Sequence, residues 1–432
     1  MSTGGGVSRD ATRTLAFQMV AVAAGFASNW ILARTLGPEG KGAVTYVGTT
    51  VWVAVTLGGL GFASAAVQHL GKRRYDAHTV VGVQLVAGLI LGVLAGGVAA
   101  GILYGAQERL GLPFHAVLLA PLLVTVALIA ANLHGVLIGR GQILTMNRLQ
   151  VITPVVWAAT AWVVLSSGVR SLGPLIGAWF GAQFVAPLVT LALVLSRVPP
   201  ARGKMREAAG SSISFGLESY AAGLLWTLVL RLDALLLGAM AGPAALGLYS
   251  VATLLGETLW YVPRALTLAL TPRIASRTAP EALSLTLRAV RMGVALVALG
   301  ALFLLIASPW LIHLVFGSSF DGSIAPLRLL LPGIIANAVA SPLALFVTQQ
   351  SGRPRINAAI GAISLVVNLV LNLWLIPTMG ASGSAIASSV AYLLTATLVA
   401  IVVSRQPGFS WRALLLARAS DLPPIGRGRK RS

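Results

Sequence analysis

The sequence contains no cysteine and few charged residues. Of its 432 residues, 57% are hydrophobic and only 10% are charged. Without cysteine, neither a disulfide framework nor a thiolate metal site can form. A soluble domain carries about 25% charged residues, which keep its surface in water. The low charge content therefore excludes an ordinary soluble globular protein of this length.

Acidic residues are the scarcest class of charge. There are 11 Asp and Glu residues against 31 Lys and Arg, which gives a formal net charge of +20. In a soluble protein this excess would indicate nucleic-acid binding, which requires basic residues gathered on one folded surface. Here they occupy short gaps between apolar runs, where basic residues set membrane topology and meet anionic headgroups. We therefore expect membrane lipids, and not nucleic acid, as partners.

Motifs of known enzymes are also missing. The sequence has no phosphate-binding loop of the P-loop type, no HExxH, and no Ser/His/Asp set outside the apolar runs. No hydrophilic connection is long enough to form a separate domain. We predict a protein that is not an enzyme, with no catalytic residue, no cofactor and no metal site.

Twelve apolar runs make up most of the chain. Each is about 20 residues long or longer, which is the length of α-helix that crosses the hydrocarbon of a bilayer. Lipid offers the backbone amides no partner, so each run must be helical. The predicted spans cover residues 14–33, 43–66, 78–104, 114–138, 149–167, 174–196, 213–238, 246–269, 289–308, 324–348, 356–376 and 382–404. The expected fold class is all-α, a polytopic integral membrane protein with 12 transmembrane helices.

Lys and Arg residues are distributed unevenly between the two sides of the membrane. With the N-terminus in the cytoplasm, 24 of them fall in or beside cytoplasmic connections and four fall in outer loops. This bias predicts a cell-membrane protein with both termini cytoplasmic and an even number of spans. The aromatic residues expected as interface anchors near the outer ends are Trp30, Tyr46, Tyr104, Trp310 and Trp374.

Short motifs recur along the chain at a nearly constant spacing. G-P-x-x-x-G occurs at residues 37–42 and again at 242–247, an offset of 205. A Gly-Arg pair and a Ser-Arg helix end recur in the same order, at offsets of 213 and 208. Chance recurrence of residues common at helix ends is the alternative, but three ordered pairs favour a duplication. An offset of six spans gives both halves the same orientation, related by a pseudo-two-fold axis along the membrane normal.

The predicted organisation follows from this duplication. Two six-helix bundles that face each other would enclose a cleft able to open to either side. The expected parts are a cytoplasmic N-terminus (1–13), a first six-helix bundle (14–196), a cytoplasmic inter-bundle loop (197–212), a second six-helix bundle (213–404) and a basic cytoplasmic tail (405–432).

A series of short motifs extends through nearly all of the predicted spans. In order they are LARTLGPEGKG, LDALLLG with GPAALGLYS, ALTPRI, LVFGSSF, SGRPRIN, VVNLVLNLWLIP and GASGSAIA. In this order the sequence resembles the polysaccharide-type flippases of the multidrug/oligosaccharidyl-lipid/polysaccharide exporter (MOP) superfamily.

The resemblance implies a carrier of lipid-linked oligosaccharides. Such a protein flips a polyprenyl-diphosphate-linked oligosaccharide from the inner to the outer leaflet by alternating access, for export and assembly of a cell-surface polysaccharide. It implies a polysaccharide polymerase and glycosyltransferases as partners, and some relatives are coupled to ion gradients. One alternative is a cation-coupled multidrug or small-molecule exporter of the same superfamily. A second, less favoured alternative is an integral-membrane glycan polymerase or ligase, which would need a larger outer loop.

Charged residues within the spans are the main candidates for a transport site. An ionised side chain at mid-bilayer costs about 2.5–3.5 kcal/mol unless it faces water or a partner. Arginine suits docking of a diphosphate, whereas a carboxyl in an apolar pocket suits ion coupling; a structural ion pair is the alternative for either. The candidates are Glu218, Arg231 and Asp233 in span 7 and Glu257 and Arg264 in span 8, with Glu257 and Asp233 as ion-coupling candidates. Seven residues apart, Glu257 and Arg264 are expected to line one cleft from the same helix face.

Polar residues in otherwise apolar runs form a second group of cavity candidates. Arg34 ends the first span, and the amides are Asn29, Asn337 and Asn368. Asn368 and Asn372 lie one helical turn apart and share a face. Amides suit the hydroxyls of a sugar, although hydrogen bonds between helices are a common alternative.

Overall fold

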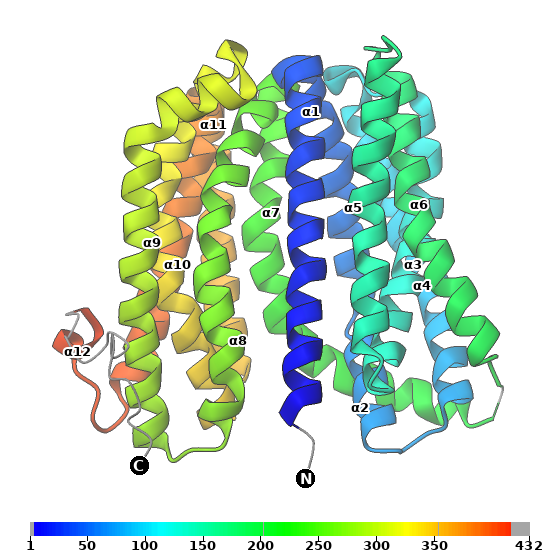
Figure 1. Ribbon diagram of the computed structural model, residues 1–432, viewed down its shortest axis with the longest axis vertical. Helices are drawn as coiled ribbons and strands as arrows, with labels where there is room; N and C mark the ends of the chain where they lie inside the picture. Colours follow the sequence, from blue (N-terminus) through cyan, green and yellow to red (C-terminus); the bar gives the residue numbers. More distant parts are fainter. Residues whose placement is uncertain (1–3, 202, 353, 416–432) are drawn as a thin grey trace. The chain divides into compact units, whose positions relative to one another are not determined.

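The computed structural model describes residues 4–201, 203–352 and 354–415, and every regular element in these ranges is helical (Figure 1). The predicted all-α fold is confirmed. The helices are α1 (Gly4–Gly59), α2 (Phe62–Gly71), α3 (Ala77–Leu110), α4 (Phe114–Gly139), α5 (Ile143–Ser166), α6 (Leu172–Arg197), α7 (Met205–Glu257), η1 (Thr258–Trp260), α8 (Tyr261–Ala275), α9 (Ala279–Phe316), η2 (Ser318–Ser323), α10 (Ile324–Ser351), α11 (Pro354–Ser404) and α12 (Trp411–Leu415).

Nine helical stretches of the described chain are long and apolar enough to cross a membrane. Three of them contain 44, 45 and 50 residues, about twice the length that one crossing needs. Each of the three includes one glycine with non-helical torsion angles, at a place where the sequence predicts a turn between two spans. These glycines are Gly37, Gly242 and Gly380. The protein is therefore a multi-pass membrane protein, and the number of twelve spans stays a prediction.

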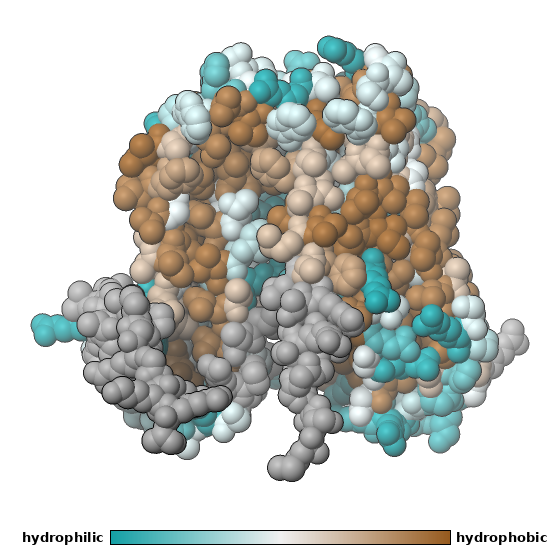
Figure 2. All heavy atoms as spheres, in the orientation of Figure 1, coloured by the Kyte–Doolittle hydropathy of each residue, from teal (hydrophilic) through white to brown (hydrophobic). Residues whose placement is uncertain are grey.

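Large apolar side chains are exposed along the outside of the helices. Figure 2 shows them gathered over the middle of the helices, with hydrophilic side chains near the helix ends. Among the predicted interface anchors, Tyr104, Trp310 and Trp374 are exposed to the surroundings. The prediction for Tyr46 was wrong, because its ring is buried and packs against Gly238.

The chain divides into two compact units, and both include parts of α7. The first unit contains the described residues up to Thr227 together with Gly238–Gly247. The second contains Leu228–Leu237 together with the described residues from Leu248 onward. The boundaries predicted for the two six-helix bundles stay a prediction.

In the first unit, α3 and α4 pack closely along a ladder of glycines. Gly88, Gly92 and Gly96 are spaced four residues apart and lie on the buried face of α3. A Cβ added to Gly92 would lie 2.6 Å from the Cα of Thr125, and one added to Gly96 would lie 2.6 Å from the Cα of Pro121. Such small residues let two backbones approach each other in lipid, where dispersion replaces the hydrophobic effect as the attraction between helices.

Replacing Gly92 with leucine is expected to destabilise the protein, because the new side chain meets backbone and α4 must shift. Overpacking of this kind costs about 1–3 kcal/mol, and a lower melting temperature in detergent would report it. Gly101 is the matched control on the same helix, since an added Cβ there meets no atom within 4 Å. Equal loss of stability in Gly92→Leu and Gly101→Leu would contradict this account of the α3–α4 contact.

In the second unit, the two parts of α11 that precede and follow Gly380 are joined by buried polar side chains. The amide of Asn368 donates to the hydroxyl of Ser388 over 3.4 Å, and Thr395 donates to Ser364 over 2.7 Å. All four side chains are buried. Apolar helices in lipid can slide past one another, so these hydrogen bonds help to fix their register. They also bring amide and hydroxyl groups to the candidate site.

Candidate functional site

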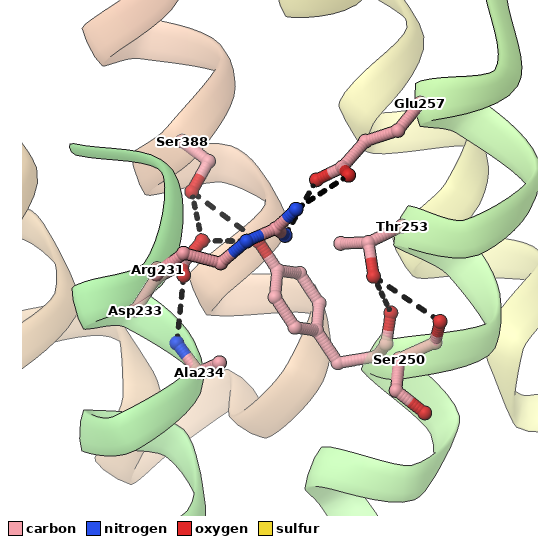
Figure 3. A network of polar contacts seen from close by, with 8 residues as sticks. Arg231, Asp233, Ala234, Ser250, Thr253, Glu257 and Ser388 are labelled. Carbon is pink, nitrogen blue, oxygen red and sulfur yellow. Dashed lines mark hydrogen bonds and ion pairs between the residues drawn. The ribbon is translucent and has the colours of Figure 1, made fainter. Parts of the chain in front are cut away.

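A bidentate ion pair lies in the second unit, between Arg231 of α7 and Glu257 at the end of the same helix (Figure 3). Nη1 of Arg231 is 2.8 Å from Oε1 of Glu257, and Nη2 is 2.9 Å from Oε2. This fork geometry is the strongest arrangement available to an arginine and a carboxylate. The two side chains are 33% and 23% exposed, so other groups can reach the pair.

The prediction that span 8, residues 246–269, is one continuous α-helix was wrong at the middle of the span. α7 ends at Glu257, the 3₁₀ turn η1 follows, and α8 begins at Tyr261. Pro263 has no N–H to donate to the carbonyl of Leu259, which favours a break in the regular helix just before it. The site carboxylate of Glu257 therefore lies at a helix end inside a predicted span.

The break also separates Glu257 from Arg264, which the sequence predicts on the same helix face. That argument requires a continuous α-helix, and the 3₁₀ turn changes the angle between the two side chains. Arg264 lies on α8 with an exposed side chain. In the described chain, Glu257 pairs with Arg231 and no ion pair joins it to Arg264. The role of Arg264 stays a prediction.

Asp233 is buried two residues beyond Arg231, and its carboxylate has a separate set of partners (Figure 3). Its Oδ1 accepts from the backbone N–H of Ala234 over 2.7 Å. Its Oδ2 accepts from the hydroxyls of Tyr249 and Ser388, the latter over 2.7 Å. An ionised carboxylate has enough lone pairs to accept all three of these hydrogen bonds. The site thus holds a buried carboxyl group surrounded by neutral hydrogen-bonding groups.

A chain of amides and hydroxyls extends away from Asp233 into α11. Asn368 donates to Ser388 over 3.4 Å, and its Oδ1 accepts from Asn372 over 3.1 Å. Ser384 lies one helical turn from Ser388, as Asn372 does from Asn368, so each pair shares a helix face. All of these side chains are buried. The arrangement gathers five oxygen-bearing side chains, only one of which is charged.

Two oxygens in this group lack partners. Oδ1 of Asn372 and Oγ of Ser384 are buried and find no hydrogen bond among the described residues. A buried polar atom without a partner is costly and calls for an explanation, such as a bound water or ion. Elsewhere in the described ranges, no three His, Asp or Glu side chains are placed to hold a metal ion. The oxygens of Asn372 and Ser384 are therefore able to accept a water or a small cation.

The other predicted site residues are described by their own hydrogen bonds and exposure. Asn29 donates to the carbonyl of Gly25 in its own helix over 2.7 Å. Asn337 accepts from Ser341 over 3.1 Å on α10. Arg34 is exposed near the end of the first predicted span. Glu218 belongs to α7, but its side chain lies outside the described part of the structure.

Sequence reasoning missed three members of the site, which are Tyr249, Ser384 and Ser388. Tyr249 follows the turn between spans 7 and 8 and reads as an ordinary core aromatic. The two serines stand in the run GASGSAIASSV, where small residues typically permit close helix packing. Their spacing of four residues was the available signal, since it matches the spacing of Asn368 and Asn372.

One known protein family matches most of the chain. The family described as "Polysaccharide biosynthesis protein" matches residues 7–278. No curated protein sequence matches the chain.

Solved structures match along nearly the whole chain. A lipid II flippase, MurJ, in an inward closed conformation superposes with a TM-score of 0.76 at 11% identity, covering 91% of this chain and 88% of that one. An inward-facing multidrug resistance MATE transporter of the MOP superfamily gives 0.65 at 16% identity, covering 89% and 96%. A MOP superfamily transporter from Pyrococcus furiosus gives 0.60 at 18% identity, covering 91% and 93%. At these identities the likeness establishes a shared fold.

Proposed function

Because the chain belongs to the polysaccharide biosynthesis protein family, within the MOP transporter superfamily, we propose that it flips a polyprenyl-diphosphate-linked oligosaccharide. Transport runs from the inner to the outer leaflet of the cell membrane by alternating access, with both termini in the cytoplasm. The oligosaccharide serves assembly of a cell-surface polysaccharide. The protein itself acts as a carrier and makes no covalent change to its substrate.

The family match over residues 7–278 is the observation that carries this proposal. The larger TM-score with a lipid II flippase than with the multidrug resistance transporters supports it. The name of that flippase gives lipid II as its own cargo. For this chain we propose only the class of cargo, which is a lipid-linked sugar.

Arg231 is the residue that we propose as the dock for the diphosphate. A guanidinium binds two phosphate oxygens through the same fork that now holds Glu257. The substrate and Glu257 therefore compete for one cation. When the diphosphate leaves, Glu257 can retake Arg231, so the pair alternates between a closed and a substrate-bound state.

Asp233 is the residue that we propose for ion coupling. A proton on this carboxyl would leave Oδ1 of Asn372 and Oγ of Ser384 without partners, whereas a cation attracts neutral oxygens as ligands. One carboxylate with amide and hydroxyl oxygens balances a single positive charge. A sodium ion fits this donor set, and it would be carried as cargo along its gradient.

A flipping assay tests the proposed function. Proteoliposomes contain a polyprenyl-diphosphate oligosaccharide with a fluorescent sugar, and a membrane-impermeant quencher reports the fraction in the outer leaflet. We expect protein-containing vesicles to equilibrate the probe at least about tenfold faster than empty vesicles, a difference of about 1.4 kcal/mol in the barrier. Equal rates would overturn the proposal.

The second candidate is a cation-coupled exporter of drugs or small molecules, favoured by the fold shared with multidrug resistance transporters. The same vesicles discriminate between the two when they are loaded with a cationic dye. Efflux of the dye under an ion gradient, without movement of the lipid-linked sugar, would favour the exporter. Glycosyltransferase genes beside the coding gene would favour the flippase.

A further inference from the structure

The connection between the two predicted bundles, residues 197–212, is packed onto the first unit. Its second half is the beginning of α7. There Ala208 and Ser212 lie one helical turn apart and are each 1% exposed, so one face of this helix end is buried in the first unit. We name residues 199–201 and 203–212 together the docked connection.

Two side chains near the start of α3 hold the docked connection through hydrogen bonds. The hydroxyl of Tyr75 donates to Oε1 of Glu207 over 3.1 Å. Nδ1 of His78 lies 2.6 Å from the carbonyl oxygen of Pro199, and a carbonyl only accepts, so this nitrogen carries a proton. The backbone N–H of Ala201 donates back to the carbonyl of His78 over 3.1 Å. The His78 contact is therefore the same whether its ring is neutral or charged.

His69 of α2 makes a third contact, and this one is buried. Nε2 of His69 lies 3.2 Å from Oγ of Ser212, and both residues are 1% exposed. The hydroxyl of Ser212 donates its one proton to the carbonyl of Ala208 over 2.8 Å, so Nε2 is the donor to Ser212. Nδ1 of His69 is buried and finds no partner among the described residues. A protonated ring would need an acceptor there as well, and the docked state provides none.

The charges around His69 do not offset this deficit. At this end of the first unit, the titratable groups of the described elements packed against α2 are Arg74, Tyr75, Asp76, His78, His134, Arg140, Lys204, Arg206 and Glu207. Both carboxylates already accept from other donors, Asp76 from Thr79 and Glu207 from Tyr75. Burial, and then the positive charge of Arg74, lower the pKa of His69. Docking therefore favours the neutral ring and loses stability as the pH falls below about 6.5, the ordinary pKa of histidine.

We propose that His69 is a pH-sensitive latch, which keeps the docked connection in place while its imidazole is neutral and releases it when the imidazole is protonated. In the released state water reaches both ring nitrogens, so the charge is no longer buried. The predicted topology places the docked connection in the cytoplasm, so the latch responds to acidification there. It acts on the chain between the two bundles and does not depend on the identity of the cargo.

Thiol labelling of purified protein in detergent tests the latch, since the natural chain has no cysteine. Ala208→Cys supplies a buried reporter for a maleimide. Gly210→Cys supplies an exposed reference on the same helix, where an added Cβ meets no atom within 4 Å, and the ratio of the two rates cancels the effect of pH on the thiol. We expect this ratio to rise about five- to tenfold from pH 7.5 to pH 5.5. One pH unit below the pKa of a free histidine, protonation favours release by up to about tenfold.

Two histidine variants assign the response. His69→Gln still offers an N–H to Ser212 but cannot become charged, so its labelling ratio should be the same at both pH values. His78→Gln is the matched control on the same connection and should keep the parental rise, because the His78 contact survives protonation. An equal ratio at both pH values in the parent, or a full rise in folded His69→Gln protein, would overturn the latch.

Amide hydrogen exchange of the natural chain keeps the test valid if a variant does not fold. After correction for the intrinsic effect of pH, exchange in residues 205–212 should also become about five- to tenfold faster at pH 5.5, because a released end of α7 of this length is not a stable helix in water. Unchanged protection would overturn the latch. Neither measurement uses a substrate, so a working latch in a protein that does not flip sugar lipids would reject the proposed function alone.

Discussion

Glu257→Gln is expected to lower the rate of oligosaccharide flipping by about tenfold to a hundredfold, while the protein remains folded in the membrane. Glutamine keeps the size of the side chain but cannot form the charged fork that holds Arg231. Hydrogen bonds to charged groups contribute about 1.5–3 kcal/mol, and the pair must re-form in every cycle. The measurement is the initial rate of probe movement in proteoliposomes, at equal amounts of protein that elutes as a single species in size exclusion.

A double variant separates a transport role from a structural one. In Arg231→Gln with Glu257→Gln, neither member of the ion pair is left as a charge without its partner, so thermal stability should recover relative to either single variant. A merely structural ion pair would let transport recover as well. We expect stability to return and transport to stay low, because the cation that docks the diphosphate is gone. Recovery of flipping in the double variant would refute the assignment of Arg231 as that dock.

Asp233→Asn is expected to abolish both the dependence of transport on a sodium gradient and the stabilisation of the protein by sodium. The substitution removes the one charge that five buried oxygen-bearing side chains share, and it places an amide donor opposite Tyr249 and Ser388. For the parent, sodium at about 100 times its dissociation constant would add about 2.7 kcal/mol of stability. Thermal unfolding in sodium and in choline chloride at equal ionic strength measures this difference.

Ser384→Ala gives a sharper test, because the site without a bound ion and the site with bound sodium predict opposite results for this variant. If no ion binds, removal of a buried hydroxyl without a partner is neutral or stabilising. If the hydroxyl is a ligand, the sodium concentration for half-maximal stabilisation should rise about tenfold, which corresponds to about 1.4 kcal/mol. Ser341→Ala is the control outside the oxygen group. Sodium stabilisation of Asp233→Asn equal to that of the parent would exclude Asp233 as the coupling residue.

Much of the fold could be predicted from the sequence because lipid imposes strong constraints on a chain. Apolar runs of spanning length must be helical, and the predicted turns at Gly37, Gly242 and Gly380 are found as non-helical residues. The interruption at Thr258–Trp260 was missed, since hydropathy is insensitive to a 3₁₀ turn within an apolar run. Tyr46 was misassigned because hydropathy cannot tell a helix face against lipid from one against another helix.

The charged residues of the site could be predicted from the sequence, but their interaction partners could not. Arg231, Asp233 and Glu257 stand out because charge is rare in predicted spans. Their pairing depends on how α7 folds back after Gly242, which brings residues 26 positions apart into contact. Ser384 and Ser388 gave no comparable signal, because serine is common where helices pack. The sequence thus reveals which groups are costly in lipid, and the structure reveals what offsets that cost.

In the first unit, Gly42 lies against Pro243 and Gly247 lies against Pro38. This reciprocal contact between the two G-P-x-x-x-G turns has a consequence for the origin of the protein. A contact in which the same patch meets itself across a two-fold axis is isologous, as in a symmetric homodimer. One copy of the six-residue motif already contains both surfaces that this contact requires. A half-length ancestor could therefore dimerise through it before gene fusion, and fusion would convert an association between two molecules into one within a single chain.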